Sequence, residues 1–441
     1  MRKEIKFMDI KAVVNWFDVQ QEIDGFGVCG AFRQADNLYK YPIYLRTKVL
    51  DLLFSVKDGA GFSIVRNIIG DSGNWGNIYD GPTKSIEPYE GVYNYEGDED
   101  QIWFMNEAKK RGCTKFISTV WSPPAWMKTN NSVNNGGELR QDKYMNFANY
   151  IVRYIKEYKS RYGIDIYAVS CANEPKLSTS YSSCLWTGEQ MSWFFSEYLG
   201  PMLEKEKIDT MVFAPETEQF GNNFLMEYKS IFSDTVSIPQ IAAQHGYGGV
   251  VEPIDAIIIK NRKLWLSEIS DVSGKVNDPS INDGLFWAKT VHEYLTKAKV
   301  NAFIYFWGMS MYYNKGISLI GLNSEEKSVV INKRLFTIGN YSRFIRPGFK
   351  RIGVTGNLCD GVFISAYNSA KGDFVLVVVN DRNENVDITV ECNGFGCSEL
   401  TAYRTSENED LKLIETLTIN ENSKIPVKGK SVTTFVGVCT S

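Results

Sequence analysis

Eight short apolar runs, separated by amphipathic stretches, dominate the chain between residues 24 and 345. Such runs, with few polar interruptions, are typical of parallel strands covered on both faces. They occupy residues 24–30, 62–70, 115–124, 166–175, 211–218, 239–248, 264–270 and 302–308. Eight strand–helix units in one chain predict an α/β fold, a (β/α)8 barrel of the TIM type.

The stretches between these runs have helical spacing, with apolar residues at i, i+3 and i+4. Five such segments occur, at residues 44–56, 144–163, 187–206, 282–299 and 331–345. Thr187 is a predicted N-cap, and either Asn282 or Asp283 is another. Side chains of these types accept hydrogen bonds from the unpaired N–H groups at a helix start.

After Pro347 the helical pattern stops, and short strands follow, separated by polar turns such as SAKGD and DRNEN. This pattern predicts a small antiparallel β-sandwich over residues 346–441. Residues 1–20 also alternate between apolar and polar side chains and are expected to join the β-sandwich. Residues 21–345 are then left for the barrel. No Pro-, Ser- or Gly-rich spacer separates the two parts, so the sandwich is predicted to be an integral side domain.

Composition excludes several classes of protein. The chain has 441 residues and a formal net charge of -4, so we expect neither nucleic acid nor an anionic membrane as a partner. No apolar run reaches the length of about 18 residues that spans a bilayer. The charged N-terminus lacks an apolar signal segment. That leaves two interpretations, a cytoplasmic protein or a secreted one whose signal peptide is absent from this sequence.

Cysteine and histidine usage argues against a metal site. The chain has 8 Cys without a C-x-x-C and only two His, His245 and His292, so no zinc site is expected. No other cofactor is expected. Cys392 and Cys397 flank NGFG, and they either close a hairpin through a disulfide or remain thiols. His292 falls within a helical pattern, so a structural role is predicted for it.

Two carboxylates follow predicted strands at the end where (β/α)8 barrels hold their functional groups. Glu174 ends the fourth apolar run within Asn173-Glu174-Pro175, and Glu268 lies near the end of the seventh. These strands lie across the barrel mouth from each other, so the two side chains are expected to converge on one cleft. A glutamate at a strand end can also be a solvated rim residue, but two in equivalent places favour a functional pair.

A pair of converging carboxylates suits glycoside hydrolysis. One must be neutral to protonate the leaving oxygen, and the other must be ionised to attack or to activate water. Their mutual repulsion raises the pKa of one of them. We therefore predict a glycosidase in which Glu174 donates the proton and Asn173 contacts the sugar hydroxyl next to the reacting carbon.

Other strand-end residues are predicted to line the same cleft. Flat aromatic rings can cover the apolar face of a sugar, although rings also pack at a barrel mouth without binding anything. The candidates are Arg66, Trp121, His245, Tyr247 and Trp307. Glu216 and Glu218 are less distinctive, and either one is expected in an ion pair or behind the residues that touch the substrate.

Several longer segments lie in order over nearly the whole chain: GFGVCGAFRQA, GFSIVRN, WSPPAWMKTN, NEP, HGYG, LWLSEIS, YSRFIRPG and SVTTFV. They resemble glycoside hydrolase family 30, and IDGFGVCGAF and AWMKTNNSVNNGG are similar to its fungal-type xylanases. The resemblance implies a barrel with a side β-domain, an acid/base at Glu174 and a nucleophile at Glu268. It further implies a secreted, retaining endo-β-1,4-xylanase that acts on plant xylan and xylooligosaccharides. We expect it to be a monomer.

Two departures concern the arginines with which such relatives bind the glucuronate branch of xylan. Bacterial glucuronoxylanases carry an Arg soon after the eighth strand, where this chain reads FWGMSMYYNKG. Fungal-type relatives often read AFQRA in the first loop, where this chain reads Phe32-Arg33-Gln34-Ala35. Arg33 stays a candidate substrate contact, but neighbouring positions of an extended loop face opposite ways. No strict dependence on glucuronate is therefore expected.

Other functions fit the same pattern. Within the family, the alternatives are an exo-acting xylobiohydrolase, a glucuronoxylanase, and another β-glycosidase such as a β-glucanase. From a different class, the chain could be a carbohydrate-binding protein without catalysis. Intact Glu174 and Glu268 argue against that last alternative.

Overall fold

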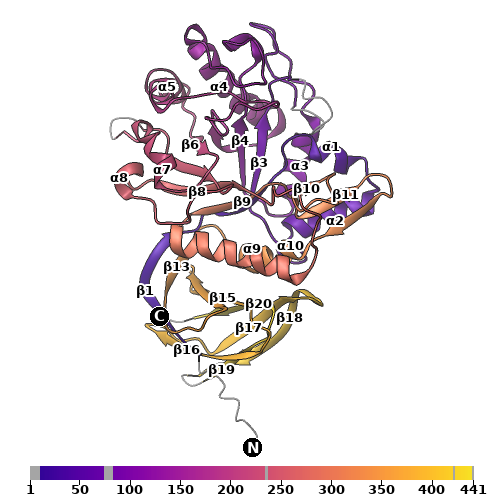
Figure 1. Cartoon of the computed structure of the whole chain (residues 1–441), viewed down its shortest axis with the longest axis vertical. Coiled ribbons are helices and arrows are strands. Elements are labelled where there is room, and N and C mark those ends of the chain that lie inside the picture. Colours follow the sequence, from indigo (N-terminus) through magenta and orange to yellow (C-terminus); the bar gives the residue numbers. More distant parts are fainter. Residues whose placement is uncertain (1–9, 74–82, 234–236, 421–422, 440–441) are drawn as a thin grey trace, which may run out of the picture.

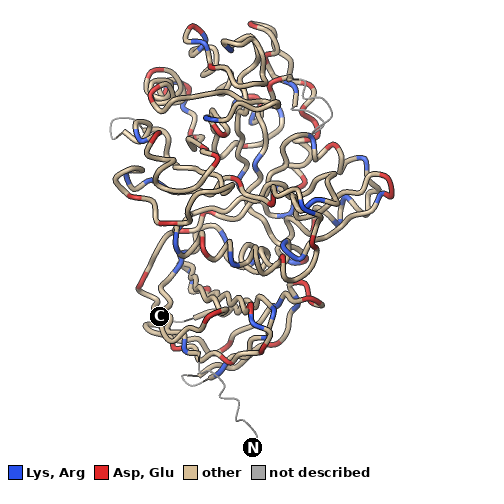
Figure 2. Tube along the Cα trace, in the orientation of Figure 1, with Lys and Arg blue, Asp and Glu red and all other residues tan. Residues whose placement is uncertain are grey.

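The computed structural model describes residues 10–73, 83–233, 237–420 and 423–439. A strand barrel wrapped by helices forms one end of the molecule and a sheet forms the other, with helices α9 (Ile281–Glu293) and α10 (Lys333–Ser342) between them (Figure 1). Positive and negative residues are interspersed along both parts (Figure 2). Among the described residues, no helix has the length and apolar character needed to cross a membrane.

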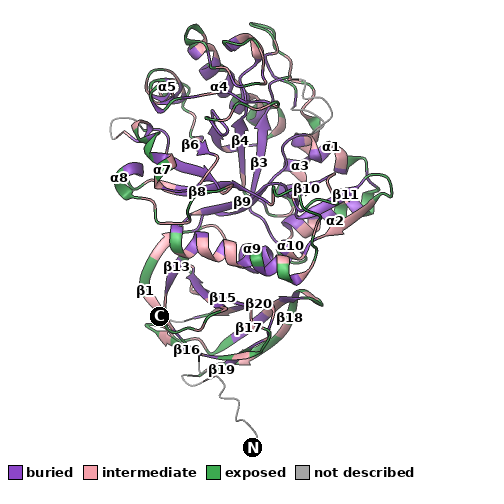
Figure 3. Ribbon diagram, viewed as in Figure 1, coloured by how far each residue is buried: buried purple, intermediate pink, exposed green. Residues whose placement is uncertain are grey.

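Eight parallel strands, β2 to β9, close into a barrel in chain order. They are Gly25–Cys29 (β2), Ile64–Ile69 (β3), Lys115–Val120 (β4), Ile166–Ser170 (β5), Met211–Thr217 (β6), Ile241–His245 (β7), Lys263–Ile269 (β8) and Ala302–Tyr305 (β9). Each overlaps one apolar run, so the predicted (β/α)8 barrel is confirmed. These strands are almost entirely buried (Figure 3), because helices cover them outside and side chains fill the interior.

The predicted helical segments are helical. They overlap α2 (Ile43–Phe54), α4 (Tyr144–Tyr162), α5 (Gly188–Phe194), α6 (Gly200–Lys205), α9 and α10. Thr187 caps α5 as predicted: its hydroxyl accepts a hydrogen bond from the Gln190 N–H at 3.1 Å, and the Gln190 side chain accepts one from the Thr187 N–H at 2.8 Å.

Helix α9 begins at Ile281, directly after Ser280. Asn282 and Asp283 are therefore wrong as N-caps, because both lie inside the first turn. Asp283 accepts hydrogen bonds from Nε and Nη2 of Arg334, each at 2.7 Å. This bidentate pair joins α9 to α10, so the side chain is used between helices rather than at a helix end.

Other elements were not predicted from the helical spacing, and α3, which lies between β3 and β4, is as long as α2. They are α1 (Gln34–Tyr39), α3 (Glu99–Lys110), α7 (Asn222–Met226), α8 (Ala256–Ile259), β10 (Met309–Ser310), β11 (Ile320–Asn323) and β12 (Ser328–Ile331). Strands β10 to β12 form a small separate sheet after the last barrel strand.

Nine strands form the side sheet, in the order β18-β17-β20-β15-β14-β13-β1-β16-β19. They are Ile10–Glu22 (β1), Lys350–Asn357 (β13), Val362–Asn368 (β14), Asp373–Asn380 (β15), Val386–Asn393 (β16), Glu399–Ser406 (β17), Glu409–Thr418 (β18), Lys424–Val427 (β19) and Ser431–Val438 (β20). β1 pairs antiparallel with β13 and parallel with β16. The boundaries at residues 20 and 346 stay predictions, and residues 1–9 lie outside the described part.

Strand β15 is buried on both faces. Leu376 and Val378 pack in the core of the side sheet, whereas Val375 and Val377 join the core of the barrel. The two-residue period of a strand puts these neighbours on opposite faces. Helix α9 packs against β14, β15 and β20, and helix α10 packs against β17, β18 and β20. Barrel and side sheet therefore share a continuous apolar interface.

A disulfide joins Cys397 to Cys439. This corrects the hairpin bridge considered for Cys392 and Cys397, because Cys392 is a free, half-buried thiol. Cys439 follows β20, whose end returns beside Cys397, with a Cα–Cα separation of 4.7 Å. That proximity depends on the order of strands in the sheet, which local spacing of cysteines does not reveal.

Candidate active site

Glu174 and Glu268 reach the barrel mouth from different kinds of backbone. Glu268 lies within β8, one residue before its end. β5 ends earlier than the sequence indicated, at Ser170, so Glu174 lies in the loop beyond it. Its φ of 47° is in the left-handed region. Its N–H donates to the Glu216 carbonyl at 3.0 Å, which fixes this loop against the neighbouring strand.

Both carboxylates line a cavity of about 390 Å³ at the barrel mouth. Trp121, Asn173 and Tyr247 line it as well. The remaining walls come from Phe32, Leu177, Tyr181, Glu218, Gln219, Val272, Phe306 and Ile317. A carboxylate oxygen of Glu174 lies within 4.8 Å of one of Glu268. The two side chains therefore converge on one cavity.

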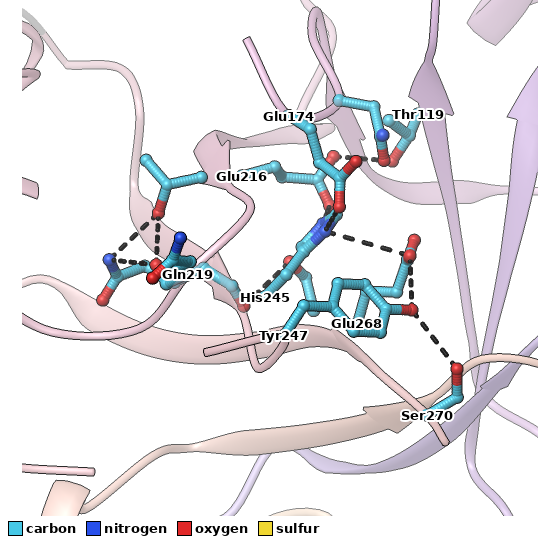
Figure 4. A network of polar contacts seen from close by, with 12 residues as sticks. Thr119, Glu174, Glu216, Gln219, His245, Tyr247, Glu268 and Ser270 are labelled. Atoms are coloured by element: carbon cyan, nitrogen blue, oxygen red, sulfur yellow. Dashed lines mark hydrogen bonds and ion pairs between the residues drawn. The ribbon is translucent and has the colours of Figure 1, made fainter. Parts of the chain in front are cut away.

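Glu268 is surrounded by hydrogen-bond donors (Figure 4). The Tyr247 hydroxyl donates to its Oε1 at 2.8 Å, and Arg66 Nη1 donates to its Oε2. His245 Nδ1 lies 3.9 Å from Oε1. Burial and the nearby Glu174 raise the pKa of Glu268, while His245 and Arg66 oppose that rise. These donors favour the ionised form of a carboxylate that is only 5% exposed.

Arg66 lies in the middle of β3 and is fully buried, so it is beneath the cavity rather than at a strand end. Its Nη2 donates to Asn173 Oδ1 at 2.8 Å and to Glu216 Oε1 at 3.0 Å. Its Cζ lies 4.4 Å from the centre of the Trp121 ring. Thr119, which no sequence signal indicated, accepts from Arg66 Nε at 3.2 Å and donates to Glu216 at 2.9 Å. Arg66 thereby orients the residues that form the cavity floor.

His245 ends β7 and is fully buried between acidic groups. Its Nδ1 lies 3.0 Å from Glu174 Oε1, and its Nε2 lies 3.4 Å from Glu216 Oε1. Burial alone would lower the pKa of His245, but Glu268, Glu174 and Glu216 outweigh it and raise the pKa to about 10. The imidazole is therefore protonated at neutral pH, donates from both nitrogens, and lies behind the cavity wall.

Among the described residues, Glu174, His245 and Glu268 are close enough to hold a metal ion. A protonated imidazole has no lone pair for a metal, however, and His245 is held in that form by its carboxylate neighbours. Glu216 completes this buried network. Burial alone would raise the pKa of Glu216, but Arg66 and His245 lower it. Of the two less distinctive glutamates, Glu216 is the one in an ion pair.

Trp307 and Arg33 do not line the cavity. The Trp307 ring is fully buried and lies parallel to that of Tyr312, with centroids 6.1 Å apart, while its neighbour Phe306 lines the cavity. Arg33 precedes α1 with a left-handed φ of 58°. Its guanidinium lies 3.7 Å from the Asp36 carboxylate. The structure thus separates these two predicted residues from the carboxylate pair.

A larger hollow of about 590 Å³ adjoins the cavity and shares Tyr247 and Val272 with it. Its other walls are the loop after β8 and one face of α9, where Phe286 is 57% exposed. It contains neither Glu174 nor Glu268. The carboxylate pair therefore belongs to the smaller cavity alone.

The sequence model of glycosyl hydrolase family 59 matches residues 23–322, which contain the barrel and both carboxylates. The chain belongs to this family. This glycosyl hydrolase is also similar to proteins of family 30, the family that its sequence segments resemble.

Glucuronoxylanase XynC of Bacillus subtilis is 26% identical over 354 residues, which are 76% of each chain. The catalytic domain of GH30 xylanase C from Talaromyces cellulolyticus is 27% identical, with a TM-score of 0.83 over 97% of this chain and 100% of that one. Endo-1,6-β-D-glucanase BGN16.3 of Trichoderma harzianum is 26% identical over 236 residues, 49% of this chain and 48% of the relative. The predicted likeness to family 30 is confirmed.

Proposed function

We propose that this glycosyl hydrolase is a retaining endo-β-1,4-xylanase. The observation that carries the proposal is the pair Glu174 and Glu268, which lie within 4.8 Å of each other in a cavity with aromatic walls. Relatives named as a glucuronoxylanase and a xylanase support xylan as the substrate. Because xylan is an extracellular polymer, we also propose that the protein is secreted, and that it acts as a monomer.

The short distance between one carboxylate oxygen of Glu174 and one of Glu268, within 4.8 Å, supports retention of configuration. Retaining enzymes place them about 5–5.5 Å apart, whereas inverting enzymes need roughly 6.5–9.5 Å to admit a water molecule. Glu268 is the nucleophile in this proposal, because Tyr247 and Arg66 donate to it and stabilise its charge. Its carboxylate attacks the anomeric carbon and forms a covalent glycosyl-enzyme.

Glu174 is the acid/base. It protonates the glycosidic oxygen as that bond breaks, and then removes a proton from the water that hydrolyses the glycosyl-enzyme. The His245 imidazolium contacts Oε1 of Glu174 at 3.0 Å, so we expect Oε2 to carry the transferred proton. His245 is a positioning residue, since it lies behind the cavity wall.

The cavity walls suit a neutral pentose. Trp121, Tyr247, Phe32 and Phe306 supply flat rings that can cover the apolar faces of sugars. Asn173 Oδ1 accepts from Arg66, which directs the Asn173 amide N–H groups away from Arg66 to donate to a sugar hydroxyl. No Lys, Arg or His is among the described residues that line the cavity. We therefore propose no strict dependence on glucuronate branches.

A β-1,6-glucanase is the second candidate, because the Trichoderma harzianum relative carries that name. The experiment is a product and stereochemistry profile on linear xylan, glucuronoxylan and β-1,6-glucan, with the first anomer formed followed by NMR. Internal cleavage of linear xylan with an initial β-anomer is expected. An initial α-anomer would overturn retention, and activity confined to β-1,6-glucan would favour the second candidate.

A further inference from the structure

Glu218 is a carboxylate of the active-site cavity that the proposed mechanism does not use. It lines the cavity together with Glu174 and Glu268. Its Oε2 is buried and has no hydrogen-bond partner within the described part of the chain. A buried carboxylate oxygen that has lost water without gaining a donor is destabilised. The Glu218 side chain as a whole is half-buried and lines the cavity, so a ligand with hydrogen-bond donors can approach its carboxylate.

The backbone around Glu218 is fixed on both sides. The Glu218 carbonyl accepts a hydrogen bond from the Tyr247 N–H at 3.3 Å. The next carbonyl, of Gln219, accepts from Gln244 Nε2 at 3.1 Å. The Gln219 side chain packs so closely on Gly248 that a Cβ there would meet it at 3.0 Å. Glu218 is therefore presented at a defined place on the cavity wall.

The cavity wall is acidic. Glu174, Glu218 and Glu268 line it, and no basic side chain is among the described lining residues. The cations Arg66 and His245 are fully buried behind the wall. Arg66 is hydrogen-bonded to Glu268, Glu216 and Asn173, and His245 is hydrogen-bonded to Glu174. A neutral sugar with hydroxyl donors fits such a wall, whereas a sugar that carries a carboxylate is repelled by it.

The strand order puts Glu218 closer to Glu174 than to Glu268 along the barrel rim. β6, which leads to Glu218, is hydrogen-bonded to β5, which leads to Glu174. β7 separates β6 from β8 and Glu268. Glu174 protonates the leaving oxygen in the proposed mechanism, so the sugar beside Glu174 and Glu218 is the one that leaves.

We propose that Glu218 is a specificity-determining residue for the leaving-group sugar. This inference rests on the proposed function and deepens it. The Glu218 carboxylate accepts hydrogen bonds from hydroxyl groups of that sugar and disfavours a leaving-group sugar with an acidic branch. Cleavage is thereby directed to bonds whose leaving side is uncharged.

The test compares two substrates with the same glycone, a linear xylooligosaccharide and an aryl β-xylobioside whose leaving group is a phenol. Glu218→Ala should lower the ratio of kcat/KM for the linear substrate to that for the aryl substrate by about 10- to 100-fold, as expected for lost hydrogen bonds to a charged group. Glu218→Gln, which keeps the shape, should raise the relative kcat/KM for an oligosaccharide with glucuronate on the leaving side by about tenfold.

Glu227→Gln is the matched control, since Glu227 pairs with Lys176 outside this cavity, and its ratio should equal that of the wild type. Ratios within twofold of wild type in both Glu218 variants would overturn the proposal. If Glu218→Ala does not fold, the Glu218→Gln result decides. If the wild type cleaves β-1,6-glucan instead of xylan, the proposed function fails, and the same ratio is measured with oligosaccharides of that glucan.

Discussion

The two histidines of the chain lie in different environments: His245 is fully buried among charged groups, whereas His292 is half-buried and its imidazole is neutral. At the barrel mouth, His245 contacts Glu174 and Glu216, and the acidic groups around it raise its pKa to about 10. Between barrel and side sheet, His292 of α9 packs against Phe363 of β14, with ring centroids 5.6 Å apart. Burial lowers the pKa of His292 to about 4.

Burial alone lowers the pKa of both imidazoles, so the difference comes from their partners. The barrel mouth brings together groups of opposite charge that stabilise one another in the absence of water. The interface between barrel and sheet is closed by apolar packing and keeps its imidazole neutral. In the proposed mechanism the charged region carries the chemistry, whereas the neutral region holds the two parts together by apolar packing.

The largest expected effect is at the centre of the charged region. Glu268→Gln removes the proposed nucleophile with almost no change of shape, so kcat should fall by about 10³-fold or more. The melting temperature should stay close to that of the wild type. Activity within tenfold of wild type, after removal of contaminating enzyme, would show that Glu268 is not the nucleophile.

Glu174→Ala should separate two kinds of substrate. On xylan, which needs a proton on its leaving oxygen, kcat should fall by about 10²- to 10⁴-fold. On an aryl xyloside with a strongly acidic phenol the loss should be much smaller, because that leaving group needs no proton. Initial rates on both substrates measure this, and equal losses would contradict the acid/base role.

His245→Gln and His292→Gln test the comparison of the two histidines directly. Loss of the His245 charge removes an interaction that opposes the raised pKa of Glu268, so the acidic limb of the kcat/KM profile should move to higher pH. We also expect kcat to fall by about 10- to 100-fold. His292→Gln should leave the limb in place. A shift of the same size in both variants would mean that His245 acts only through folding.

The smallest expected effect is on stability at acid pH. Because the pKa of His292 is lowered to about 4 on folding, the unfolded chain binds a proton between about pH 6.5 and 4 that the folded chain does not. Stability should therefore fall as pH falls, by about 2 kcal/mol from this group between pH 7 and 5. Urea unfolding of His292→Phe should lack that part of the decrease. If the stability of His292→Phe depended on pH as the wild type does, His292 would not be the group responsible.

Periodicity in the sequence was sufficient to predict the barrel strands, the main helices and the convergence of Glu174 and Glu268, because buried parallel strands and barrel mouths follow general rules. Periodicity did not predict which of two neighbouring side chains faces the cavity. At β6 the pairing with β7 is irregular between Pro215 and Thr217, and Glu216 has a left-handed φ of 60°. Such a local distortion sends Glu216 beneath the cavity and Glu218 onto its wall.

The same limit applies beside other predicted residues. Phe306 lines the cavity where Trp307 was predicted to do so, and Phe32 lines it beside Arg33. A shift of one residue at a strand end exchanges the side chain that faces the cavity for its neighbour. The positions of Arg66 and His245 behind the wall depend on contacts across the barrel between distant segments, which no local pattern records.

The position of β1 in the side sheet determines when this strand can pair during synthesis. Its residue Ile10 pairs with Ile388, and Lys11 pairs with Asn357. Ribosomes add about 5–20 residues per second, so the first strand waits roughly 20 to 75 s for its last partner to be synthesised. Until then Ala12 and Val14, which are fully buried in the finished sheet, have no partner strand, so the side sheet can close only after residue 388 has been made.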